Sequence, residues 1–174
     1  MGGRSAAGTA LRMGDRMLKH LQTAYMAVAA VLLTTIFLHS PGTKDVAIWM
    51  RWAINSDLYG AVAGFNANNA DYPPLASAML LCVVRVSHLT GLALIDAIKL
   101  SIALFTCLTS LIFWLWTRDI ALTILLHFSL LLNGVALGYI DIYFAPSLIL
   151  LLWALRERKL TLFSVAFSIA SLTK

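Results

Sequence analysis

The residues best suited to chemistry in this sequence are aspartates that lie between apolar runs or at their edges. Carboxylates beside an apolar phase are costly, so acids in such places are functional candidates by default. A carboxylate can take a proton from a hydroxyl group as a general base, or it can share a metal ion. The aspartates of this kind are Asp45, Asp57, Asp71, Asp96 and Asp141. For Asp57, Asp71 and Asp96 a solvated acid or a helix cap is the simpler interpretation, whereas the surroundings of the other two favour function.

The composition defines the kind of protein that must position these acids. Hydrophobic residues make up 60% of the chain and charged residues only 12%, which excludes an ordinary soluble globular domain. Cys82 and Cys107 both lie inside apolar runs, and the four histidines are scattered. The sequence therefore predicts neither a disulfide framework nor a metal cluster.

Long apolar segments predict transmembrane helices, which need about 20 residues each. The segments are Leu21–Leu38, Ala97–Trp116, Ile120–Ile140, Ile142–Leu155 and Leu160–Thr173, the last of which stops at the end of the sequence. We therefore expect an all-α, polytopic membrane helical bundle, and we expect this chain to be the N-terminal part of a longer protein. Residues 1–20 would form a basic cytoplasmic N-terminus, and residues 21–174 an incomplete transmembrane module.

A further apolar segment, Leu75–Gly91, carries Arg85 and His88 on one helical face. If it spanned the membrane, the basic cluster Arg156–Lys159 would lie outside, against the bias of basic residues toward the cytoplasm. A charged side chain in the middle of a bilayer also costs several kcal/mol. We therefore interpret Leu75–Gly91 as an interfacial or re-entrant helix on the outer side.

With that segment left out of the count, the basic residues fall on one side. The N-terminus, Arg118 and Arg156–Lys159 would face the cytoplasm, while residues 40–96 and the turn at 138–141 would face the exterior. Within the exterior segment, Lys44–Tyr59 has the pattern of a helix lying flat on the membrane. Its tryptophans, Trp49 and Trp52, would lie half-buried at the interface, as expected of indole. The exterior segment would thus contain two juxtamembrane helices.

Several short motifs occur in an order that is typical of one family. "KDVAIWMRWA" places an aspartate early in the first exterior loop, and "DYPP" follows at Asp71–Pro74. Later come Asn133, the Gly-x-x-Asp turn from Gly138 to Asp141, a span, a basic turn and Lys174. In these motifs the chain resembles the GT-C superfamily of integral membrane glycosyltransferases, which take sugars from polyprenyl-phosphate carriers. The likeness is to dolichyl-phosphate-glucose glucosyltransferases and to glycosylphosphatidylinositol mannosyltransferases, although Tyr139 stands where the latter often have glutamine.

The resemblance implies a site and a reaction. A hexose or related sugar would move from the polyprenyl-phosphate donor to an acceptor hydroxyl that is lipid-linked or extracytoplasmic. Asp45 would be the catalytic base, and Asp141 would orient the acceptor or share a divalent metal; no other cofactor is expected. The remaining substrate-binding candidates are Asp71, Tyr72, Arg85, His88 and Lys174. Of these, the two cationic side chains of the interfacial helix and the terminal lysine would contact the phosphate, although Arg85 could equally extend to lipid headgroups.

A different class of protein remains open. A non-enzymatic transporter, a flippase fragment or an accessory subunit would also carry acids at the membrane edge. The early aspartate and the "DYPP" motif favour the transferase, because a transporter has no particular need for them. We expect a multi-pass protein of the bacterial inner membrane rather than of the endoplasmic reticulum, with the donor and the lipid membrane as partners and no nucleic acid.

Overall fold

The computed structural model describes residues 24–25, 28–68 and 72–173. Within these residues all regular structure is helical. A helix at Val28–Leu38 precedes α2 (Asp45–Tyr59), α3 (Ala61–Asn68), α4 (Pro74–Thr90), α5 (Leu94–Thr117), α6 (Ile120–Leu130), a π-helix η1 (Leu131–Ala136), a 3-10 helix η2 (Ile140–Phe144), α7 (Ala145–Arg156) and α8 (Leu160–Thr173). The predicted all-α class is confirmed for this part of the chain.

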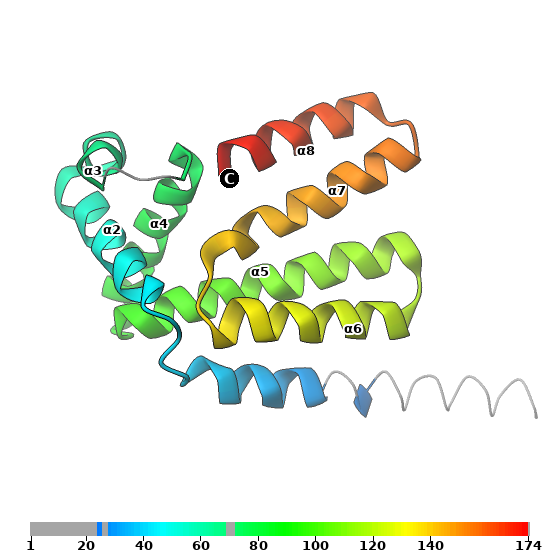
Figure 1. Ribbon diagram of the computed structural model, residues 1–174, viewed down its shortest axis with the longest axis horizontal. Helices are drawn as coiled ribbons and strands as arrows, with labels where there is room; N and C mark the ends of the chain where they lie inside the picture. Colours follow the sequence, from blue (N-terminus) through cyan, green and yellow to red (C-terminus); the bar gives the residue numbers. More distant parts are fainter. Residues whose placement is uncertain (1–23, 26–27, 69–71, 174) are drawn as a thin grey trace, which may run out of the picture.

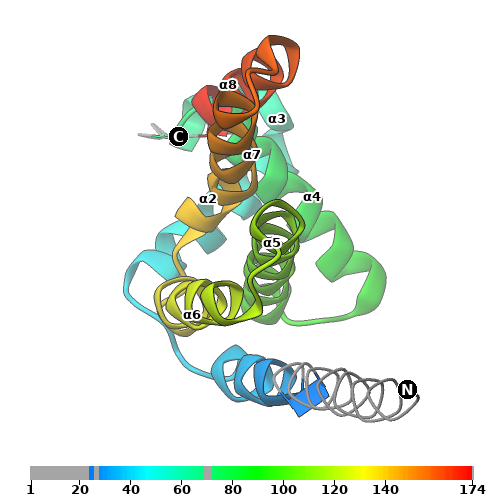
Figure 2. The same ribbon diagram turned by 90° about the vertical axis from the view of Figure 1, so that its right-hand side faces the viewer.

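The helices form two groups with different directions. The helices α5, α6, α7 and α8 run along the long axis of the molecule, and α5 contacts both α6 and α7 (Figure 1). The helices α2, α3 and α4 gather at one end of this group, where α2 and α4 run across the long axis (Figures 1 and 2). The two helices expected from the sequence at Lys44–Tyr59 and Leu75–Gly91 thus occur as α2 and α4 at one end of the long helices, and their position beside a membrane stays a prediction.

Among the described residues, α5 is the one helix long and apolar enough to span a membrane. It has 24 residues, which corresponds to a length of about 36 Å, more than the hydrocarbon core of a bilayer requires. It ends where Arg118 adopts a left-handed conformation and its N–H bonds to Trp114 O. The expected run Ile120–Ile140 is interrupted, because the helical segment ends at Ala136 and Gly138 turns the chain with φ +77°.

The helix α4 begins and ends close to where the sequence predicted. Pro73 lies at the N-cap and Pro74 in the first turn, where a missing N–H costs nothing. Gly91 ends the helix in the left-handed conformation and its N–H bonds to Ser87 O, a common C-terminal arrangement. At 17 residues, α4 is shorter than α5 and runs across it (Figure 1).

The helix α2 also has the predicted bounds, but its tryptophans are not half-exposed. Trp49 is 6% and Trp52 is 5% exposed, because α2 packs against α3 and α4. Both indoles belong to the main hydrophobic core, together with Leu80 of α4, Ile98 and Ile102 of α5, Val135 of η1 and Tyr143 of η2. The interpretation of these tryptophans as interface anchors was therefore wrong, and they join the layer α2–α4 to α5.

The fold predicts that the two ends of α5 lie on opposite sides of a membrane. Thr90 lies just before α5, and Glu157 ends α7 beside the other end of α5, where Arg156 contacts Trp116. In a background in which Cys82 and Cys107 are alanine, Thr90→Cys and Glu157→Cys should react with a membrane-impermeant maleimide from opposite sides. Labelling of both from the same side would show that α5 does not span.

Candidate functional site

The two segments predicted to face the exterior dock on one another. The backbone N–H of Thr43 donates to Leu137 O at 2.8 Å, and Ser40 Oγ donates to Ala136 O at 2.8 Å. A little further along the chain, the indole of Trp49 donates to Gly138 O at 3.0 Å. The start of α2 is therefore hydrogen-bonded to the turn that leads into η2, although the two lie about ninety residues apart in sequence.

Two glycines allow this close approach. Gly42 and Gly138 both have positive φ, at +72° and +77°. A Cβ atom on Gly138 would lie 2.5 Å from Val46 Cγ2, and one on Gly42 would lie 2.7 Å from the same atom. Val46 is buried at this contact. Asp45 is the neighbour of Val46 and begins α2, so its backbone lies close to this contact.

A buried lysine joins the first helix and the docked segment to α5. Lys99 is fully buried, and its ammonium donates to Phe37 O at 3.2 Å, to Ser40 Oγ at 2.6 Å and to Ser40 O. Phe37 lies in the last turn of the helix Val28–Leu38, where a cation is favoured by the unpaired carbonyl groups. Lys99 thus holds the chain just before the segment that carries Asp45.

Asp141 receives a hydrogen bond from a residue of the "DYPP" motif. Tyr72 OH donates to Asp141 Oδ1 at 2.6 Å, so the two quoted motifs meet in space. The ring of Tyr72 makes edge contacts with Trp49 and Trp52, whose centroids lie 5.4 and 6.0 Å away, and the two indoles contact each other at 5.1 Å. These aromatic rings fix the phenol, and the phenol orients the carboxylate.

A cavity of about 400 Å³ opens beside Asp141. Its polar wall includes Asn133 and Tyr139, and the rest is mostly apolar, contributed by Leu130, Gly134, Ile142, Phe144, Ala145 and Leu148. Asn133 belongs to the π-helix η1, an irregular form of helix that is frequent at functional sites. The asparagine and the Gly-x-x-Asp turn named from the sequence therefore contribute to one cavity.

A second polar contact lies behind this turn, between η2 and α5. Tyr143 of η2 is 2% exposed, and its hydroxyl lies 2.6 Å from Ser101 Oγ. This contact connects η2 to α5.

The structure does not bring Arg85 and His88 to this centre. Arg85 Nε lies 2.8 Å from Asp57 Oδ1, and His88 Nε2 lies 3.9 Å from Asp57 Oδ2. Arg85 lies about 17 Å along α4 from Pro74, and hence far from Tyr72. The expectation that Asp57 is a solvated acid was wrong, because its side chain is 17% exposed and ion-paired. The phosphate-binding role of Arg85 and His88 stays a prediction.

Two of the predicted site residues, Asp71 and Lys174, lie outside the described residues. Within residues 28–68 and 72–173, no group of three or more His, Cys, Asp or Glu side chains is placed to hold a metal ion. The divalent metal considered for Asp141 therefore stays a prediction. Sequence reasoning missed Lys99, although a lysine inside an apolar run is a recognisable signal of function or of a specific partner.

Comparisons with protein-family models, with curated proteins and with solved structures find no match to this chain. The described chain is an all-helical protein with one helix that can span a membrane. At one end of that helix, Trp49 of α2 donates to Gly138 O in the turn before η2. Close to this contact in the chain, Asp141 accepts a hydrogen bond from Tyr72.

The docking contact predicts unequal effects for two glycine substitutions. Gly91 and Gly138 have similar positive φ values, but a Cβ on Gly91 meets nothing within 4 Å. Both alanine variants carry the backbone strain of the left-handed region, whereas only Gly138→Ala also overpacks against Val46. Overpacking typically costs about 1–3 kcal/mol, so Gly138→Ala should unfold at a clearly lower temperature than Gly91→Ala in detergent. Equal midpoints would contradict the close contact.

Proposed function

We propose that this chain works in a membrane glycosyltransferase that moves a hexose or related sugar from a polyprenyl-phosphate carrier to an acceptor hydroxyl. The observation that carries the proposal is the hydrogen bond from Tyr72 to Asp141. It joins the "DYPP" motif of the first segment to the Gly-x-x-Asp turn of the second, and these are the motifs on which the resemblance rests. If the two motifs matched the family only by chance, there would be no reason for them to lie in contact.

The direction of the helices supports the proposed topology. The helices α2 and α4 run across α5 at one of its ends (Figure 1), as interfacial helices would if α5 spans the bilayer. We therefore place α4 on the outer surface and the remaining apolar helices with α5 in a polytopic bundle. Arg118 and the basic turn after α7 then lie at the cytoplasmic end, as the bias of basic residues requires.

The proposed reaction is a substitution at the anomeric carbon of the sugar. Asp45 accepts the proton of the acceptor hydroxyl, whose oxygen bonds to the anomeric carbon as the bond from that carbon to the phosphate oxygen breaks. The electron pair of the broken bond leaves with the polyprenyl phosphate, which is a stable anion and needs no protein acid. Asp45 suits the role of base because it begins α2 partly exposed, close to the docked turn.

Asp141 has a different role in the proposal. Its Oδ1 atom already accepts a hydrogen bond from Tyr72 OH, and it lines the cavity beside Asn133 and Tyr139. A carboxylate oriented in this way can hold an acceptor hydroxyl in line with the anomeric carbon. Correct alignment of the reacting atoms is itself a large part of catalysis.

The proposal predicts that Asp45→Asn abolishes sugar transfer in membranes that contain the full protein. The change keeps the size of the side chain and removes the base, and base catalysis contributes about 10²–10⁴-fold in rate. The measurement is transfer of radiolabelled sugar from a polyprenyl-phosphate donor, normalised to the amount of inserted protein.

Asp119→Asn is the matched control for this experiment. Asp119 caps α6 by accepting from Leu122 N at 3.1 Å, and asparagine caps a helix equally well. It lies at the opposite end of α5, so its replacement should leave transfer unchanged. If Asp45→Asn transfers sugar as fast as the wild type and the Asp119 variant, Asp45 is not the base.

A further inference from the structure

Basic and aromatic side chains gather at the end of the long helices that lies away from α2–α4. Three cations lie over tryptophan rings, in the pairs Arg118–Trp114 at 5.3 Å, Arg156–Trp116 at 5.9 Å and Lys159–Trp153 at 5.8 Å. The second pair joins the end of α7 to the end of α5, so both turns belong to one surface. Tryptophan with a neighbouring cation is typical of the level of lipid headgroups.

The charge of this surface is positive. The two turns contain four basic residues, Arg118, Arg156, Arg158 and Lys159, and two acidic ones, Asp119 and Glu157. The carboxylate of Asp119 is engaged in capping α6. The surface therefore offers excess cationic groups to an anionic ligand.

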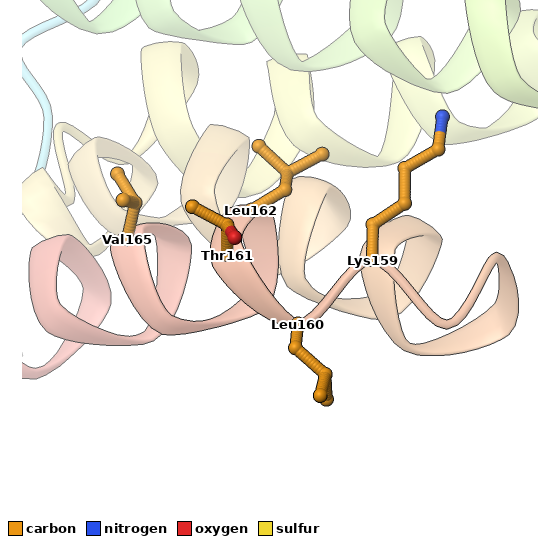
Figure 3. Close-up of a pocket in the computed structure, with 5 residues that line it drawn as sticks. All are labelled: Lys159, Leu160, Thr161, Leu162 and Val165. Carbon is orange, nitrogen blue, oxygen red and sulfur yellow. The ribbon is translucent and has the colours of Figure 1, made fainter.

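A cavity of about 530 Å³ lies at the α7–α8 turn on this surface. Its lining combines one cation, Lys159, and one hydroxyl, Thr161, with Leu160, Leu162 and Val165. Figure 3 shows that the side chains of Lys159, Thr161, Leu162 and Val165 extend to the same side of the turn, whereas Leu160 extends to the other. The lining of the cavity thus combines polar and apolar groups.

The apolar residues around the cation distinguish between classes of ligand. Leu155 is 60%, Leu160 is 78% and Val165 is 52% exposed, so large apolar side chains surround the basic turn. A nucleic acid or a free anion would use the cations and leave these side chains in water. A phospholipid uses both, because its phosphate meets the cations and its acyl chains cover the leucines.

We propose that this surface binds an anionic phospholipid, with the phosphate at Lys159 and Arg156 and the acyl chains along Leu162 and Val165. The hydroxyl of Thr161 donates to the glycerol or phosphate oxygens. The indole of Trp153 holds the lysine ammonium at headgroup level. The bound lipid thereby fixes the end of the α7–α8 pair against the membrane surface.

Lipid binding by the purified protein tests this site without any transfer assay, so its outcome is independent of the proposed reaction. The protein in detergent is titrated with phosphatidylglycerol or phosphatidylcholine, and native mass spectrometry measures the retained lipid. Phosphatidylglycerol should bind more tightly, and its advantage should fall as ionic strength rises. Equal binding of the two lipids would overturn the proposal.

Two glutamine variants locate the site on the turn. Lys159→Gln should weaken phosphatidylglycerol binding about fivefold, as expected for one basic residue at an anionic surface. Arg158→Gln removes the same charge from the same turn, but Arg158 neither lines the cavity nor contacts a tryptophan, so it should change binding less. Equal losses would mean diffuse surface charge instead of a site. Displacement of the lipid by millimolar inorganic phosphate would also contradict a lipid ligand.

Discussion

The arrangement of this protein depends on one buried cation. Lys99 lies inside α5 with no exposed surface, and a charged group there is very costly unless its donors are paired. Its partners are Phe37 O and the backbone and side-chain oxygens of Ser40. The chain from Phe37 to Ser40 must therefore lie against α5. The segment that leads into α2 starts from this position.

From that anchor, a series of hydrogen bonds leads to the candidate site. Ser40 donates to Ala136 O, Thr43 to Leu137 O and Trp49 to Gly138 O. These three hydrogen bonds hold the start of α2 against the chain that follows η1. The last hydrogen bond of the series runs from Tyr72 OH to Asp141 Oδ1. Hydrogen bonds of this kind are stronger in apolar surroundings than in water. A site assembled from two distant segments can be held in place in this way at the edge of a membrane.

The bounds of individual helices were predicted well from the sequence, whereas the contacts between helices were predicted poorly. The bounds of α2 and α4 were evident because proline, glycine and apolar periodicity act within a few residues. The burial of Trp49 and Trp52 and the pairing of Arg85 with Asp57 depend on which helix lies opposite, and that information is not local. The resemblance gave both Asp141 and Tyr72 as site residues, but the hydrogen bond between them was not predicted.

The close contact between the start of α2 and the turn at Gly138 can be tested with one engineered disulfide. A Cβ on Gly138 would lie 3.9 Å from Val46 Cβ, within the range of about 3.5–4.5 Å that a disulfide requires. We would introduce Val46→Cys and Gly138→Cys where Cys82 and Cys107 are alanine, with a protease site in the α5–α6 turn. Mild oxidation in the membrane should join the two fragments, whereas Val46→Cys with Glu157→Cys, at the far end of α7, should leave them separate. Fragments that separate in both cases, or that join equally, would show that Val46 and Gly138 are not in specific contact.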